Sequence, residues 1–155
     1  MRFRSTVEFT RPGNITAYTG GDVIGPTGGG SSLLTFEMPS NRVSIIGAQV
    51  ISDQAWDPSG GMLILAASPY APGVDNAAGV LPSYADGYLT GMLLAPEAPV
   101  NVNAHSSQPW FGHSLPVTLP GNRMYGALLT PSGFTPTSGQ KFSVSVLLEH
   151  ELWRG

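Results

Sequence analysis

The chain has 155 residues, of which 41% are hydrophobic and 11% are charged, with a net charge of −3 and no cysteine. This composition excludes a disordered chain, a disulfide scaffold and thiolate chemistry. Lys141 is the single lysine, so no basic stripe is present and we expect no nucleic-acid partner. The length is that of one ordinary domain, and we predict a single domain over residues 1–155.

The charged fraction is low beside the roughly 25% that is typical of soluble domains. Small polar residues must then cover the surface, or other copies or a larger partner must hide part of it. No apolar run reaches the roughly 18 residues of a membrane helix, and the alternating N-terminus lacks the apolar core of a signal peptide. We therefore expect a subunit of an assembly that is made in the cytoplasm and does not contact membranes.

The N-terminal stretch RFRSTVEFT alternates along its whole length. Its odd-numbered residues from Phe3 to Phe9 fall on one face, and its charged residues fall on the other. A period of two predicts a β-strand with one face in water.

The next stretch, TRPGNITAYTGGDVIG, covers residues 10–25. Pro12-Gly13 predicts a turn after the first strand, and Gly20-Gly21-Asp22 predicts a second turn. We interpret Asp22 as a side chain that caps this loop rather than as a catalytic acid. The whole stretch is interpreted as the corner that fastens the first strand to the rest of the fold.

Two strand-like stretches, residues 31–39 and 42–53, flank the turn residues Pro39-Ser40-Asn41. This arrangement predicts a β-hairpin. The apolar run GMLILAAS, residues 61–68, is bounded by glycines and a proline and is short for a helix. It predicts a buried central strand.

Further strands are predicted at residues 88–95, 113–119, 123–130 and 141–152. In the last, KFSVSVLLEHEL, alternate positions are apolar, from Phe142 to Leu148 and again at Leu152. PSYADGYLTG offers one or two helical turns at most. Glycine and proline recur between the strands every 8 to 12 or so residues, which is typical of a sandwich or barrel. The predicted fold is all-β: a single-domain, antiparallel, jelly-roll-like β-sandwich of about eight strands.

Catalytic and metal-binding patterns are absent from the sequence. His105 and His113 are expected in loops and His150 at an outer edge of the last strand, and no His-x-His pair occurs. GPTGGGSS, residues 25–32, lacks the Gly-Lys-Ser/Thr ending and the following helix of a phosphate loop. We predict that the protein is not an enzyme and has no cofactor, no metal and no catalytic residue.

Asp53 and Asp57 flank Trp56 in the sequence SDQAWDPSGG. Two carboxylates beside an aromatic ring are compatible with a Ca²⁺ site or with sugar binding. Asp-Pro-Ser-Gly is also a common turn, in which the aspartate bonds to its own backbone. The turn is the favoured interpretation, because the other calcium ligands are not visible in the sequence.

Trp56, Trp110 and Phe111 are the candidate protein-interface residues. QPWFGH places Trp110 and Phe111 side by side in a loop with proline and glycine, so we expect one of them to face outward. Exposed aromatic residues favour protein interfaces. Anchoring in the core and a platform for sugars are the alternatives.

Two segments resemble a family of small structural proteins from tailed bacteriophages. In FTRPGNITAYTGGDVIG, a strand ends in an Arg-Pro turn and continues as Thr-Ala-Tyr, two small residues and Gly-Asp-Val. SPYAPGVDNAAG resembles the Asp-Asn-Ala segment that follows an apolar strand in that family. The Gly-Gly-Gly insertion and the low charge depart from the family pattern. The matching residues are Arg11, Pro12, Thr16, Ala17, Tyr18, Gly21, Asp22, Val23, Gly25, Asp75, Asn76 and Ala77.

The resemblance implies a virion component with a jelly-roll-like sandwich. The expected protein is a capsid decoration (cement) protein that binds the major capsid protein on the capsid exterior as a homo-oligomer, with a trimer favoured. The alternative is a tail or baseplate subunit, or a module that binds host glycans or receptors through the aromatic loops. No functional residue is transferred from the family.

Overall fold

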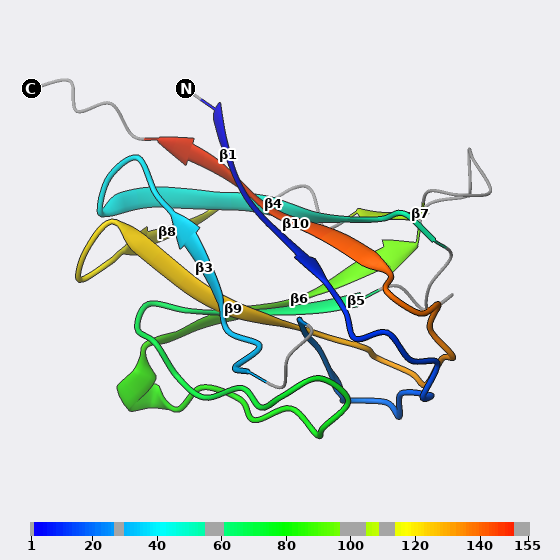
Figure 1. Ribbon diagram of the computed structural model, residues 1–155. Helices are drawn as coiled ribbons and strands as arrows, with labels where there is room; N and C mark the ends of the chain where they lie inside the picture. Colours follow the sequence, from blue (N-terminus) through cyan, green and yellow to red (C-terminus); the bar gives the residue numbers. More distant parts are fainter. Residues whose placement is uncertain (1, 27–29, 55–60, 97–104, 109–113, 151–155) are drawn as a thin grey trace, which may run out of the picture.

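A computed structural model describes residues 2–26, 30–54, 61–96, 105–108 and 114–150. Two antiparallel layers face each other in a sandwich (Figure 1). The first layer contains β1 (Arg2–Thr10), β10 (Lys141–His150), β4 (Arg42–Ser52), β7 (His105–Gln108) and β8 (Leu115–Thr118). The second contains β2 (Val23–Ile24), β3 (Leu34–Glu37), β9 (Arg123–Leu129), β5 (Gly61–Ala66) and β6 (Tyr88–Pro96).

The ten strands of the described residues fill eight strand positions, four in each layer. β7 and β8 pair with opposite ends of the same side of β4, and β2 and β3 pair with successive parts of β9. Across the first layer the order is β1, β10, β4, then β7 and β8; across the second it is β2 and β3, then β9, β5, β6. The layers join where β6 pairs with β7. The predicted jelly-roll-like β-sandwich is therefore confirmed.

The core lies between the layers. Along β10, the side chains that face the core are Phe142, Val144, Val146 and Leu148, each at most 1% exposed. Phe142 stacks against Phe9 of β1, with ring centroids 5.5 Å apart. The alternation predicted at both ends of the chain is thus confirmed over the described residues, because each terminal strand has one core-facing side.

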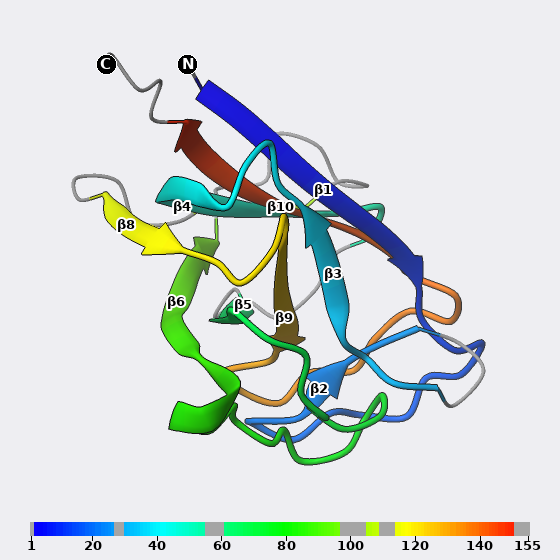
Figure 2. The same ribbon diagram turned by 90° about the vertical axis from the view of Figure 1, so that its left-hand side faces the viewer.

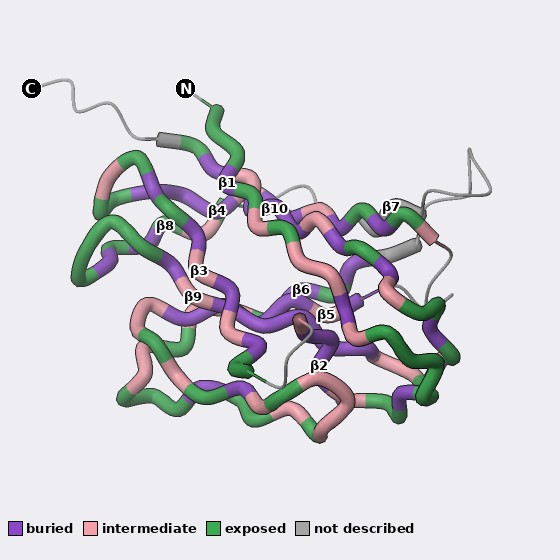
Figure 3. The backbone as a smooth tube through the Cα atoms, in the orientation of Figure 1, coloured by how far each residue is buried: buried purple, intermediate pink, exposed green. Residues whose placement is uncertain are grey.

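A second apolar cluster covers the outer face of the second layer. Ile64 of β5 packs there with Val23, Ala127 and Leu129, and Tyr70 lies against them. The chain between β5 and β6 runs along this face (Figure 1), so β5 is buried on both sides. Most residues of β5 are buried, as the colours of Figure 3 indicate. Burial of both faces explains why GMLILAAS is a continuous apolar run, as the prediction of a central strand required.

Two predictions from the sequence were wrong. β3 pairs with β9 and β4 pairs with β10, so residues 31–53 do not form a hairpin, and the turn at Pro39 crosses from one layer to the other. Turn residues mark a reversal of the chain but do not say which strand will be the hydrogen-bonded neighbour. His105 begins β7 rather than lying in a loop. The strand was missed because backbone pairing holds it in place and its sequence has no apolar pattern.

The remaining local predictions are close to the structure. The strands at residues 88–95, 113–119 and 123–130 appear as β6, β8 and β9. Within the described ranges, the one helical element is η1 (Tyr84–Asp86), a single 3₁₀ turn that Ser83 caps at its start and that Gly87 ends with φ 70°. No helix in the described part of the chain is long and apolar enough to cross a membrane.

Candidate functional site

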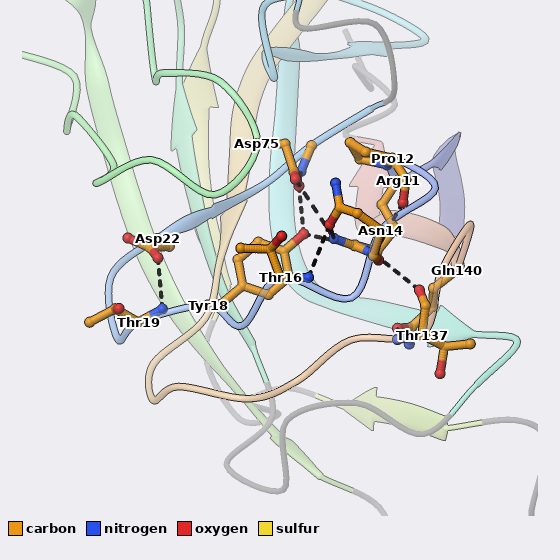
Figure 4. A network of polar contacts seen from close by, with 11 residues as sticks. Arg11, Pro12, Asn14, Thr16, Tyr18, Thr19, Asp22, Asp75, Thr137 and Gln140 are labelled. Carbon is orange, nitrogen blue, oxygen red and sulfur yellow. Dashed lines mark hydrogen bonds and ion pairs between the residues drawn. The ribbon is translucent and has the colours of Figure 1, made fainter.

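Arg11 is the most unusual buried residue among those described, since it is a cation that is only 1% exposed. It follows β1 directly, and its backbone N–H donates to the carbonyl oxygen of Gln140 at 3.0 Å. This bond continues the β1–β10 ladder by one residue and fixes the position of the Arg11 backbone, from which the side chain extends. The guanidinium then points into the loops at the end of the sandwich (Figure 4).

Loop carbonyl groups surround the guanidinium of Arg11. Nη1 donates to the carbonyl oxygens of Pro12 (3.1 Å), Asn14 (2.6 Å) and Thr137 (3.0 Å), and Nη2 donates to Oδ1 of Asn14 at 3.1 Å. A planar fork of donors suits several acceptors that approach in one plane. Arg11 thus ties the chain after β1 to the chain before β10.

Asp75 supplies the negative charge. Nε of Arg11 donates to the Tyr18 hydroxyl at 2.9 Å, and that hydroxyl donates to Oδ1 of Asp75 at 2.5 Å. The backbone N–H of Gly25 donates to the same carboxylate oxygen at 2.9 Å, while Nη2 of Arg11 lies 3.9 Å from Oδ2. We call Arg11, Asn14, Tyr18, Gly25 and Asp75 the Arg11 network.

The Arg11 network is arranged for stability and offers no reactive group. Burial of the Tyr18 ring, together with the hydrogen bond to Asp75, raises the pKa of the Tyr18 hydroxyl above its usual value. The ring is held in place by stacking on Phe134, with centroids 5.1 Å apart. A neutral phenol that donates one bond and accepts another cannot serve as a base, and Asp75 is already bonded from two sides.

The segment at residues 10–25 packs directly on the segment at residues 68–79. Val23 donates its N–H to the carbonyl of Ala77, and Asn76 donates its N–H to the carbonyl of Val23, both at 2.9 Å. Asp22 forms a β-bridge with Ala78, and its Oδ2 accepts the N–H of Thr19 at 2.7 Å. The prediction that Asp22 caps a loop is confirmed, and residues 10–25 are the corner that the sequence predicted.

Gly25 has a structural reason to be glycine. A Cβ at this position would overlap the side chain of Ser32, and the N–H of Gly25 already bonds to Asp75. The start of the glycine-rich stretch is therefore used for close packing at the Arg11 network.

The predicted interface residues Trp56, Trp110 and Phe111 lie outside the described residues, as do His113 and Asp57. His105 and His150 pair with Ser52 and Val43, at opposite ends of β4, so the structure does not bring them together. Among the described residues, no group of three or more His, Asp and Glu side chains could hold a metal ion.

An exposed apolar surface lies on the segment between β5 and β6. Val80 and Leu81 are more than half exposed, and Tyr84 on η1 is 99% exposed. These residues were not predicted as a surface from the sequence, although the apolar pair before a proline in GVLPSY was the available signal. We call Val80, Leu81 and Tyr84 the η1 patch.

A groove of about 500 Å³ lies between β6 and the start of β8. Its walls are mainly apolar, and Thr90 and Ser114 contribute the two hydroxyl groups among the residues that line it; the others are Ile45, Gly91, Met92, Leu93 and Leu115. These residues include no acid, base or strong nucleophile, so the groove resembles an open edge of the sandwich rather than a reaction site.

Comparisons with protein-family models and with curated sequences find no match. The solved structure of a family two carbohydrate esterase from Cellvibrio japonicus is weakly similar, with 11% identity and a TM-score of 0.19. The comparison covers 94% of this chain, and the chain spans 34% of the esterase chain. Similarity at this level supports no conclusion about fold or activity.

Proposed function

We propose that the protein is a structural component of a tailed-bacteriophage virion, namely a capsid decoration protein that binds the assembled major capsid shell. The observation that supports this most is the packing of the two phage-like segments. Residues that match in sequence but lie fifty positions apart, Gly25 and Asp75, meet in one buried network. A resemblance confined to unrelated surface loops would not bring its residues together in this way.

The composition and the surface support the same proposal. A chain with few charges and an exposed apolar patch is suited to contact with a larger partner. The η1 patch is the described surface that we assign to the capsid, and Trp56, Trp110 and Phe111, the interface residues predicted from the sequence, are proposed to add to it. Aromatic residues are enriched in such contacts.

The proposed mechanism is thermodynamic. A protein that binds the assembled shell, and not free subunits, stabilises the shell by mass action, by about 2.7 kcal/mol per site at a concentration of one hundred times Kd. The decoration protein then needs a rigid fold and a complementary surface, and needs no catalytic group. The interlocked sandwich and the Arg11 network provide that rigidity.

The experiment compares capsids assembled with and without the protein. We expect decorated capsids to rupture at a higher temperature and to contain the protein in their heads. The double variant Leu81→Ser/Tyr84→Ser should fold normally and show reduced occupancy, whereas Ile15→Ser, which alters a similarly exposed residue outside the η1 patch, should decorate normally. Equal rupture temperatures, with the protein missing from heads, would refute the proposal. Presence in tails would instead favour the tail or baseplate alternative.

A further inference from the structure

β1 is an edge strand with a long free side. It pairs with β10 along all nine of its residues, and no other described strand pairs with it. Figure 2 shows β1 running along the rim of the first layer. Arg2, Arg4, Thr6 and Glu8 are exposed. A free edge of this length is a template for pairing with another strand.

The hydrogen-bonding phase of the ladder identifies which backbone groups are free. Arg11 and Gln140 continue the β1–β10 register and are bonded to each other, so the odd-numbered residues of β1 direct their N–H and C=O groups toward β10. Lys141, opposite Thr10, uses its backbone toward β4 instead: its carbonyl accepts from Asp53 N–H, and its N–H donates to Asp53 Oδ1. The even-numbered residues therefore point their backbone groups to the free side.

The charges on this edge are complementary to a second copy of the same edge. In an antiparallel pairing with Thr6 opposite Thr6, Arg4 lies opposite Glu8 of the second copy, and Glu8 lies opposite its Arg4. Arg2 then lies opposite Thr10. All nine residues overlap, and each even-numbered residue meets an even-numbered residue, which is the phase that backbone bonding requires.

Other registers satisfy fewer of these conditions. A shift by two residues in one direction places Thr6 opposite Glu8 and leaves no opposite charges facing. A shift in the other direction places Arg2 opposite Glu8 but leaves Thr10 unpaired. A shift by one residue puts odd-numbered residues, which are already bonded to β10, against the partner's edge.

We infer that two copies of the chain join through β1 about a two-fold axis at Thr6, making one continuous sheet from the two first layers. Such a contact is isologous and closed, and it would contain about ten backbone hydrogen bonds, two from each pair of even-numbered residues. It stands independently of the proposed function. It gives the homo-oligomer expected from the sequence a two-fold contact in place of a trimer.

The charge test measures mass in solution by light scattering over a range of concentrations. Arg4→Glu and Glu8→Arg, each alone, place like charges opposite each other twice, and we expect each to shift the equilibrium at least tenfold toward monomer. The double variant Arg4→Glu/Glu8→Arg should restore the dimer. A mixture of the two single variants should form a heterodimer, because one copy is then negative and the other positive at both positions.

The register test uses the absence of cysteine from the chain. Thr6→Cys should cross-link to itself under mild oxidation, since opposed residues in a bonded pair have Cα atoms about 5.5 Å apart, within disulfide reach. Thr10→Cys is the matched control on the same face and should not cross-link, because it faces Arg2.

The two tests can each overturn the inference. A wild-type protein that stays monomeric at every concentration would refute it. If the wild-type protein is an oligomer and both single charge variants have the same mass in solution as the wild type, the contact lies elsewhere. Equal cross-linking of Thr6→Cys and Thr10→Cys would lead to the same conclusion. Circular dichroism of each variant establishes that it is folded before its mass is compared.

Discussion

Arg11 sits where burial of a charge would ordinarily be costly. Removing a guanidinium from water carries a penalty of several kcal/mol, which is offset only when hydrogen bonds and an opposite charge replace the lost water. Here carbonyl oxygens of three loop residues, the Tyr18 hydroxyl and the carboxylate of Asp75 do so. The same bonds join the loop after β1 to the loop before β10, because Arg11 donates to carbonyl oxygens on both.

Arg11→Met should therefore destabilise the protein strongly. The change keeps much of the apolar volume but removes the opposite charge that faces the buried Asp75 carboxylate, the donor to the Asn14 carbonyl and the donor to the Tyr18 hydroxyl. We expect a loss of about 3 to 5 kcal/mol in the free energy of unfolding, measured with urea. The control is Arg123→Met, which breaks the exposed ion pair with Glu37 and should cost under about 1 kcal/mol. Equal losses for the two variants would contradict a central role for Arg11.

Asp22→Ala should lose stability without losing function. Its carboxylate accepts the N–H of Thr19 in the corner, and loss of such a cap costs about 1 kcal/mol. Capsid occupancy per folded molecule should stay at the wild-type level, which a binding assay on capsids measures. A variant with an unchanged melting temperature and lost capsid binding would show that Asp22 has a functional role after all.

We expect the stability of the protein to fall at alkaline pH because of the buried Tyr70 hydroxyl. Burial raises the pKa of its hydroxyl from 10.0 to about 12, and that hydroxyl has no hydrogen-bond partner among the described residues. Between these pH values the unfolded chain loses the proton while the folded chain keeps it, so the free energy of unfolding falls as pH rises. Tyr70→Phe should flatten this fall in urea titrations at pH 9 to 11, and should cost little at pH 7. An unchanged slope would mean that Tyr70 is not the responsible group.

At the scale of elements, the sequence predicted those strands whose pattern is local. β1 and β10 alternate because each has one face in the core, and β5 is continuously apolar because both of its faces are covered. Partner choice is not local, so the turn at Pro39 could not distinguish a hairpin from a crossing between layers. β7 was missed because its residues, His-Ser-Ser-Gln, carry no hydrophobic period.

The contact between β5 and β9 is unusually close at one position. A Cβ on Gly126 would lie 2.5 Å from the carbonyl oxygen of Ile64, so Gly126→Ala must push the two strands apart. We expect a loss of about 1 to 3 kcal/mol, the usual cost of overpacking a core. Gly121→Ala is the matched control, because nothing lies within 4 Å of its added Cβ. Thermal unfolding of both variants measures the difference, and similar melting temperatures would refute the close contact.

At the scale of the whole molecule, the corner at residues 10–25 was predicted from its turns and its capping aspartate. The buried Arg11 side chain at the centre of this corner was not predicted. It is buried only because the loop before β10 and the segment at Asp75 pack around it. An arginine beside Pro-Gly is indistinguishable in sequence from an ordinary surface turn. The buried network depends on contacts across 57 and 126 positions of the chain, which no local pattern encodes.

The pairing of the two ends of the chain also governs how the protein folds. β1 lies against β10, and β4 lies between β10 and two later strands, so the first layer cannot form until nearly the whole chain has been brought together. Folds dominated by such distant pairings fold in milliseconds to seconds, because loop-closure entropy is lost before the contacts form. We expect stopped-flow refolding of Glu8→Arg, the variant expected to favour the monomer, to fall in that range, with one cooperative unfolding transition at equilibrium. Microsecond refolding, or separate transitions for the two layers, would show that one layer folds without the other.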